Sequence, residues 1–212
     1  MKRLGLLFFL AAGFLVGGLM AFWLLAPPQG NSGEGQSTGR ALVGGPFQLV
    51  NQDGQPVTDQ DFRGRLMLVF FGFTHCPDIC PTELQTMAVA LNQLGQDADK
   101  VAPLFITLDP ERDTPEKIKT YVQSFDNRLI GLTGSREDID KAAKAYRVYH
   151  RKAKPSADAT ASDYTIDHSA FVYLMDGKGE YITHFSFGVP PEKMVDAIRR
   201  SLQSSQVKLT LG

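Results

Sequence analysis

The stretch that most constrains the fold is an apolar run that delivers two cysteines to the start of a helix. Residues 66–71, LMLVFF, form a nearly continuous apolar run, which is typical of a central strand covered on both faces. Cys76 and Cys80 follow it, four residues apart and each succeeded by a proline. After Cys80, Pro81 suits the first position of a helix, where a missing N–H leaves no hydrogen bond unmade. We therefore expect a strand, a cysteine loop and a helix in immediate succession.

The rest of the chain alternates between strand-like and helix-like patterns. Apolar residues recur at helical spacing after four sites: Cys80, Thr114, Ser135 and Pro190. Strand-like segments cover residues 47–49 and 57, 101–108, 129–132, 169–175 and 180–185. Alternating strands and helices predict a mostly parallel sheet with helices on its faces. An N-terminal β-hairpin, a closing antiparallel hairpin and a final helix make this an α/β, thioredoxin-like fold with a mixed central sheet.

The N-terminal segment differs in kind from this domain. Lys2 and Arg3 precede an uncharged run over residues 4–25, long enough to cross a hydrocarbon core of roughly 30 Å. Because a signal peptide has an apolar region of only roughly 7–15 residues, we expect a single transmembrane helix, retained as an anchor over residues 1–26. Residues 27–41, rich in Gly, Ser, Gln and Pro, predict a flexible tether to a domain over 42–205.

The charges at the two ends of this anchor predict its orientation. Positive residues stay on the cytoplasmic side, so the domain should face the opposite side of the membrane. No amphipathic, Arg-rich transit peptide precedes the anchor. We therefore expect a bacterial inner-membrane protein with its domain in the periplasm. The chain carries 22 basic and 23 acidic residues, and this balance argues against a nucleic-acid partner.

The two cysteines allow three readings when they are taken alone. A helix N-terminus favours the thiolate form, and two close thiolates can either oxidise to a disulfide or hold a soft metal ion. A purely structural disulfide is the third reading, but it would close a very small loop and add little stability. The redox, metal and structural readings all stay open at this point.

His168 favours a metal site. A lone histidine before a strand is usually a surface or hydrogen-bonded residue, but in a thioredoxin-like arrangement its loop lies beside the cysteine loop. Two thiolates and one imidazole suit Cu(I), and with an added water or carboxylate they accept Cu(II). Structural zinc would need four protein ligands. The predicted site is therefore Cys76, Cys80 and His168, binding copper as Cu(I) or Cu(II).

Other polar residues near these positions are weaker candidates. Asp167 could orient the His168 ring from outside the ligand set, or could be a plain turn residue. Asp78 is expected to cap the helix rather than bind metal, and it is the second candidate outside the ligand set. His75 could add a ligand, although adjacent side chains on a loop often point apart. His150 and His184 are read as surface or core residues.

The stretch DPERDT over residues 109–114 places two aspartates and a glutamate around an arginine at a strand end. Three interpretations remain open for this stretch. It could be an ion-paired loop that positions its neighbours, a docking patch for a partner, or ordinary turn and helix-cap chemistry.

Five sequence blocks together resemble the Sco/SenC family of copper-binding, thioredoxin-like proteins. The blocks occur in order over about residues 42–203: GGPF (44–47), FGFTHCPDICPT (71–82), DPERDT (109–114), GLTG (131–134) and DHS (167–169). The resemblance implies a metallochaperone, not an enzyme, that assembles the dinuclear copper centre of cytochrome c oxidase. The family's metal ligands fall on Cys76, Cys80 and His168. The implied partners are the copper-bearing oxidase subunit and an upstream copper chaperone.

Alternative functions remain beside this one. The chain could be a thiol–disulfide oxidoreductase that keeps target cysteines reduced, or a sensor in redox or copper homeostasis. The spacing of three residues between the cysteines argues against a general oxidoreductase, whose usual motif has two. A peroxidase on the same scaffold is a weaker reading.

Overall fold

The computed structural model describes residues 42–154 and 164–210. The predicted anchor, residues 1–26, and the tether, residues 27–41, lie outside these residues. Within the described ranges, no helix is both long enough and apolar enough to cross a membrane. The structural account therefore concerns the globular part of the chain.

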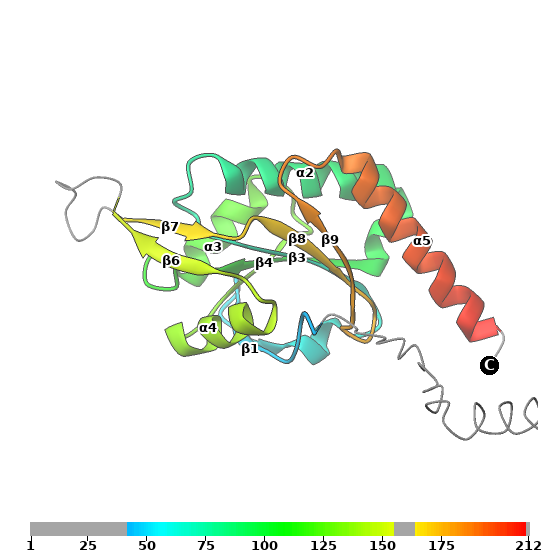
Figure 1. The fold of residues 1–212 in the computed structure, drawn as a ribbon, viewed down its shortest axis with the longest axis horizontal. Coiled ribbons are helices and arrows are strands. Elements are labelled where there is room, and N and C mark those ends of the chain that lie inside the picture. The colour runs from blue at the N-terminus through cyan, green and yellow to red at the C-terminus, as the bar shows by residue number, and fades with distance from the viewer. Residues whose placement is uncertain (1–41, 155–163, 211–212) are drawn as a thin grey trace, which may run out of the picture. The chain divides into compact units, whose positions relative to one another are not determined.

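A seven-stranded mixed sheet forms the centre of this part, and it confirms the predicted mixed sheet and the N-terminal hairpin (Figure 1). The expectation that the sheet is mostly parallel is wrong, because the hairpins at its two sides make most of its pairs antiparallel. Its strands, in spatial order, are β2 (Pro56–Thr58), β1 (Gln48–Asn51), β5 (Ile130–Thr133), β4 (Val101–Thr107), β3 (Leu66–Gly72), β8 (Phe171–Met175) and β9 (Tyr181–Ser186). The pairs β3–β4 and β4–β5 are parallel, whereas the others are antiparallel.

The two central strands are buried along their whole length, as the continuous apolar runs predict. Their parallel register pairs Gly72 with Thr107, so β3 and β4 end at the same edge of the sheet. The N–H of Leu108 donates to the carbonyl of Gly72 at 2.7 Å and extends this pairing by one residue. The loop after β3 and the turn after β4 therefore leave the sheet side by side.

Four α-helices and two short 3₁₀ helices lie on this sheet within the described ranges. They are α2 (Ile79–Leu94), α3 (Pro115–Gln123), α4 (Arg136–Ala145), α5 (Pro191–Thr210), η1 (Asp59–Phe62) and η2 (Gly95–Lys100). Helices α2 and α5 pack against each other (Figure 1). Helices α3 and α4 begin after Thr114 and Ser135 as the patterns predict, and both residues act as caps, because their side chains accept the N–H groups of Lys117 and Asp138.

Helix α2 begins earlier than the sequence predicts. We expected Pro81 at its first position, but the helix begins at Ile79 and Pro81 is its third residue. A proline fits there as well, because the first four N–H groups of a helix have no partner within the helix. The earlier start places Cys80 inside the first turn of α2 rather than ahead of it.

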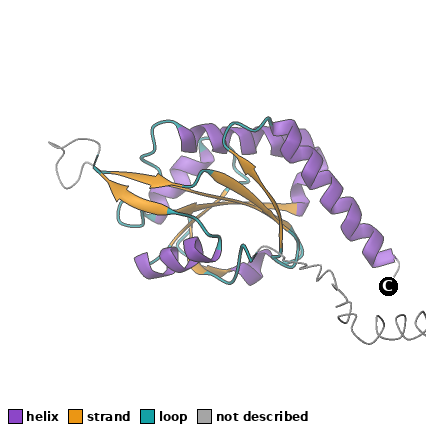
Figure 2. Cartoon of the chain, in the orientation of Figure 1, coloured by secondary structure: helices purple, strands orange, loops and turns teal. Residues whose placement is uncertain are grey.

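A second, separate hairpin carries the histidine. Strands β6 (His150–Ala153) and β7 (Thr165–His168) pair only with each other, and they project from the body on the side opposite α5 (Figures 1 and 2). The sequence pattern does not predict this hairpin, because its strands are polar and half exposed and lack a clear apolar alternation. His168 is therefore the last residue of a strand, rather than a loop residue before one.

Candidate metal centre

Three elements bring the predicted ligands together. Cys76 lies in the loop after β3, where its N–H donates to the carbonyl of Phe73 at 3.2 Å. Cys80 is the second residue of α2 and is fully buried. His168 ends β7, and the next strand, β8, pairs Val172 with Phe70 near the end of β3. The antiparallel start of β8 thus places His168 at the edge from which the cysteine loop emerges.

The potential ligand atoms of these residues form one compact group. The two sulfurs and one imidazole nitrogen all lie within 4.8 Å of one another, and Sγ of Cys80 is 3.6 Å from Nε2 of His168. In the part of the chain that the structure describes, this is the one group of three or more His, Cys, Asp or Glu residues placed to hold a metal ion. Both cysteines are free thiols rather than a disulfide.

The two sulfurs are electrostatically unequal. A hydrogen bond from the Cys80 thiol lowers the pKa of Cys76 to about 4, against the opposing effect of burial and with help from the N–H groups of Cys80 and Asp78. The same hydrogen bond, together with burial and the negative charge of Cys76, raises the pKa of Cys80. At neutral pH the pair is therefore one thiolate, Cys76, and one thiol, Cys80.

The His168 ring is oriented for binding through Nε2. Its Nδ1 lies 3.1 Å from the carbonyl oxygen of Ser169. Because a carbonyl only accepts hydrogen bonds, Nδ1 carries the proton and Nε2 presents its lone pair toward Cys80. Phe70 and Phe73 contact the ring edge to face, at centroid distances of 6.3 and 5.9 Å. The ring is thus fixed both by a hydrogen bond and by aromatic packing.

Of the two interpretations left open for Asp167, the structure does not support the one in which it orients the His168 ring. Its carboxylate lies 3.2 Å from the guanidinium of Arg151 on the neighbouring strand and is half exposed. Asp167 lines the same cavity as His168, but its carboxylate is paired with Arg151 rather than with the imidazole. The group that orients the ring is the backbone carbonyl of Ser169.

The structure also corrects the role expected of Asp78. It occupies the position ahead of α2, but its side chain makes no capping hydrogen bond. The sulfur of Cys76 instead accepts the N–H of Cys80 at 3.4 Å. The thiolate thus takes the place of a capping carboxylate, and this contact is one of those that lower its pKa.

The remaining histidines lie outside the group of ligand atoms. His75 has Nδ1 at 3.2 Å from the Thr74 hydroxyl, and half of its side chain is exposed. His150 stands directly opposite His168 in the hairpin register, but its Nε2 faces Asp140 at 3.4 Å. Nothing in the sequence pattern indicates this pairing, because it depends on the unpredicted hairpin of β6 and β7.

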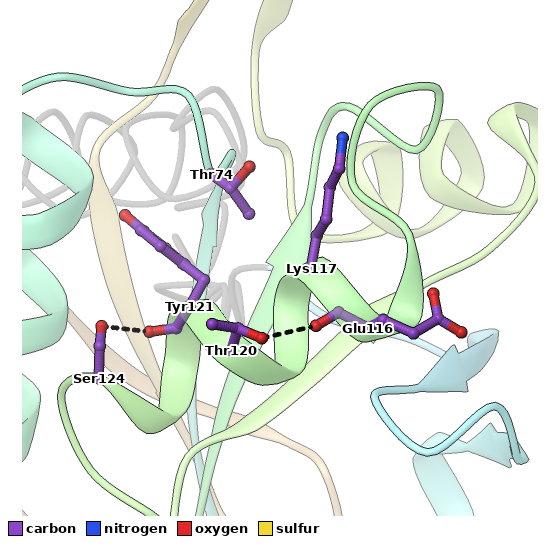
Figure 3. A pocket seen from close by; sticks show the side chains of 6 residues that line it. All are labelled: Thr74, Glu116, Lys117, Thr120, Tyr121 and Ser124. Carbon is purple, nitrogen blue, oxygen red and sulfur yellow. Dashed lines mark hydrogen bonds between the residues drawn. The ribbon is translucent and has the colours of Figure 1, made fainter.

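Two hollows adjoin the cysteine loop. A cavity of about 380 Å³ is bounded by the loop, the start of α2 and strand β7, and its lining includes Cys76, Asp78, Ile79 and His168. A larger hollow of about 550 Å³ lies between Thr74 and helix α3 (Figure 3). Only the first of these reaches the sulfur and imidazole atoms, so it is the approach to the group.

Comparison with known proteins places the chain in a family. Residues 35–203 match the family model SCO1/SenC. The chain is 42% identical over 175 residues to the mouse (Mus musculus) "Protein SCO1 homolog, mitochondrial", covering 82% of this chain and 61% of that protein. It is 44% identical over 149 residues to the human protein of the same name, covering 69% and 48%. The matched region thus spans about half to three-fifths of the length of these two relatives.

Solved structures agree with this match. The structure of Bradyrhizobium japonicum ScoI with copper bound is 46% identical, with a TM-score of 0.69 over 75% of this chain and 99% of that one. Yeast Sco1 with copper bound is 37% identical, with a TM-score of 0.68 over 76% and 89%. These findings confirm the thioredoxin-like Sco fold. From the extent of the family match and the identity to these relatives, we conclude that the chain belongs to the SCO1/SenC family.

Proposed function

We propose that this chain binds one copper ion through Cys76, Cys80 and His168 and delivers it to the dinuclear copper site of cytochrome c oxidase. The observation that carries the proposal is the convergence of two sulfurs and one imidazole nitrogen within 4.8 Å of one another. Support comes from relatives at 46% and 37% identity whose structures are described as having copper bound.

The donor set fits copper better than other common metals. Two sulfurs and one imidazole form a soft site suited to Cu(I), whereas structural zinc takes four protein ligands. Among the described residues, no fourth His, Cys, Asp or Glu joins the group. A three-ligand site leaves one side open, through which an acceptor's ligand can attack and draw the ion away. This geometry suits transfer better than storage.

The state of the thiols predicts how copper is loaded. Cys76 is already a thiolate at neutral pH, whereas Cys80 carries a proton. Binding of Cu(I) through both sulfurs must therefore release the Cys80 proton. The partly exposed Cys76 and His168 border the cavity, while Cys80 is buried. We infer that the ion enters from the side of Cys76 and His168 and reaches Cys80 last.

The test of this proposal is the copper affinity of His168→Ala. Reduced protein is titrated with Cu(I) against a chromophoric chelator in the absence of oxygen. Losing a ligand should weaken binding by more than about tenfold, since even losing a group behind a ligand commonly weakens it 10–100-fold. His75→Ala is the matched control, because this histidine lies beside Cys76 but outside the group. Unchanged affinity in His168→Ala would overturn the three-ligand site.

The cellular setting belongs to the same proposal. The uncharged N-terminal run and the charges ahead of it support a single-pass anchor in a bacterial inner membrane, with the domain in the periplasm. An upstream copper chaperone would load the domain there, and the copper-bearing subunit of the oxidase would unload it. Recovery of the intact chain from purified inner membranes would agree with a retained anchor, whereas a soluble chain beginning near Pro27 would contradict it.

Thiol–disulfide exchange is the second candidate function. It is favoured by the pairing of a thiolate, Cys76, with a buried thiol, Cys80, because a lowered pKa is typical of attacking cysteines. Here Cys76 would attack a target disulfide and Cys80 would then displace the target. The protein would end as a disulfide and the target as two thiols, with two electrons transferred. Rapid reduction of insulin by the protein would favour this reading; copper binding blocked by the disulfide would couple the two functions.

A further inference from the structure

The turn between β4 and α3, residues 109–113, is tightly built and holds two buried carboxylates. The N–H groups of Arg112 and Asp113 donate to the carbonyl of Asp109 at 3.1 and 2.9 Å. The side chains of Asp109 and Asp113 are fully buried. Buried carboxylates require partners, and these two find theirs in opposite halves of the metal site.

Asp113 fixes the loop that carries the two cysteines. Its carboxylate accepts the N–H of Thr74 at 3.0 Å and the Thr74 hydroxyl at 2.6 Å. It also accepts the hydroxyl of Thr107, the last residue of β4, at 2.6 Å. Thr74 is two residues before Cys76. Three hydrogen bonds to one buried carboxylate therefore fix the start of the cysteine loop to the end of the central strand.

Asp109 and Arg112 fix the strand that carries His168, because both contact Tyr164 at its start. The Tyr164 hydroxyl donates to Asp109 at 2.7 Å. The Arg112 guanidinium forms an ion pair with Asp109, lies 3.7 Å from the centre of the Tyr164 ring and donates to the Tyr164 carbonyl at 3.0 Å. Tyr164 directly precedes β7, the strand that ends at His168. The turn is thus bound to the first end of β7, the strand that carries the imidazole.

The outer contacts of the same hairpin are weaker. Lys152 of β6 pairs with Glu111 at 2.5 Å and lies 4.5 Å from the centre of the Tyr164 ring. Both partners of this ion pair are exposed, and exposed pairs contribute roughly 0–1 kcal/mol. The firm contacts are therefore those of Tyr164 with Arg112 and Asp109, since Asp109 is fully buried and Arg112 largely so.

The hairpin needs such contacts because it has no backbone pairing with the main sheet. Strands β6 and β7 form a sheet of their own, so the hairpin is attached through side chains, through the segment that joins α4 to β6 and through the short connection to β8. We propose that the turn over residues 109–113, with Tyr164, is a bracket that sets the distance between the cysteine loop and His168. Arg112 and Tyr164 are positioning residues for the copper site. This inference rests on the proposed function.

The principal test is a double-mutant comparison of Arg112→Met and His168→Ala. Arg112→Met should weaken Cu(I) binding by roughly 10–100-fold, as expected when a group behind a ligand is lost. If Arg112 acts through His168, the double variant should bind no more weakly than His168→Ala alone. X-ray absorption of the copper-loaded Arg112→Met protein should show a reduced imidazole contribution with both sulfurs retained, which a general loss of folding would not produce.

Arg112→Met leaves the buried Asp109 carboxylate without the Arg112 guanidinium, and breaking a buried ion pair can destabilise the fold. Two further variants therefore separate an effect on the copper site from a folding defect. Tyr164→Phe removes only the hydroxyl and should weaken copper binding in the same direction but less. Arg128→Met is the matched control. It removes the ion pair of Arg128 with Asp126 and the hydrogen bonds that Arg128 donates to Leu91 and Asn92 of α2. These residues lie far along the helix from Cys80, so copper affinity should stay unchanged.

The outcomes separate this inference from the function on which it rests. A loss in His168→Ala with none in Arg112→Met and Tyr164→Phe would overturn the bracket and leave the copper site intact. Losses that multiply in the Arg112→Met, His168→Ala double variant would likewise overturn it, because Arg112 would then act independently of the imidazole. No loss in His168→Ala would instead remove the three-ligand site itself.

Discussion

Cys76 and Cys80 differ in kind although four residues separate them. Cys80 is fully buried inside the first turn of α2, whereas Cys76 is half buried at the cavity wall. The thiolate of Cys76 accepts hydrogen bonds, and Cys80 supplies both its S–H and its N–H. The difference in pKa between the two sulfurs follows from the position of each one relative to the helix start. It makes Cys76 the reactive residue and Cys80 its partner.

Alkylation rates should reveal this inequality. A pKa of about 4 keeps Cys76 a thiolate as the pH falls from 8 to 5, so its rate with iodoacetamide should stay nearly constant. An ordinary thiol, with a pKa of about 8.5, would lose roughly tenfold in rate per pH unit below that value. The measurement is mass spectrometry of labelled peptides across this range, with Cys80 remaining largely unlabelled.

The control for this prediction is Cys80→Ala. It removes the hydrogen bond that contributes most to lowering the pKa of Cys76, so the rate profile of Cys76 should move to higher pH. An unchanged profile in Cys80→Ala would show that the Cys80 thiol does not stabilise the thiolate. A wild-type rate that falls tenfold per pH unit from 8 to 6 would contradict the lowered pKa itself.

At the scale of elements, the site is a junction of three segments that are far apart in sequence. The parallel pairing of β3 and β4 places the cysteine loop beside the turn over residues 109–113. His168 is placed from both ends of its segment: the pairing of β8 with β3 fixes the residues that follow it, and the side chains of the bracket hold the hairpin that precedes it.

Copper loading should stiffen that hairpin. A metal ion bound to Cys76, Cys80 and His168 would tie the end of β7 to the start of α2. We expect slower amide hydrogen exchange in β6 and β7 after Cu(I) is added, while the fully buried strand β3 changes little. Mass spectrometry of the apo and loaded protein measures this effect, and His168→Ala should abolish it. Equal exchange in the two wild-type states would argue against binding through His168.

At the scale of the whole molecule, the sequence predicts the core better than hairpin β6–β7, which carries His168. The runs over residues 66–71 and 101–108 indicate central strands because burial on both faces leaves them almost wholly apolar. The caps at Thr114 and Ser135 follow local rules that need no tertiary context. These features account for the seven-stranded sheet, the helices and the position of the two cysteines.

The features that the sequence could not indicate depend on contacts between distant residues. Strands β6 and β7 have few buried residues, so their polar sequence resembles a loop. The orientation of Asp167 and the opposition of His150 and His168 follow from that unpredicted pairing. Similarly, DPERDT left three interpretations open, because its partners Thr74 and Tyr164 lie 39 and 55 residues from the aspartates that bind them.

The separate hairpin has a consequence for engineering and for evolution. Because β6 and β7 share no backbone pairing with the seven-stranded sheet, the third donor sits on an interchangeable arm. The two sulfurs belong to the loop and helix that follow the central strand, whereas residue 168 can be exchanged without breaking any backbone pairing of the seven-stranded sheet. A thioether in place of the imidazole, as in His168→Met, would soften the donor set further while the sheet keeps its backbone hydrogen bonds. Its cost in stability would come from the lost packing of the ring against Phe70 and Phe73.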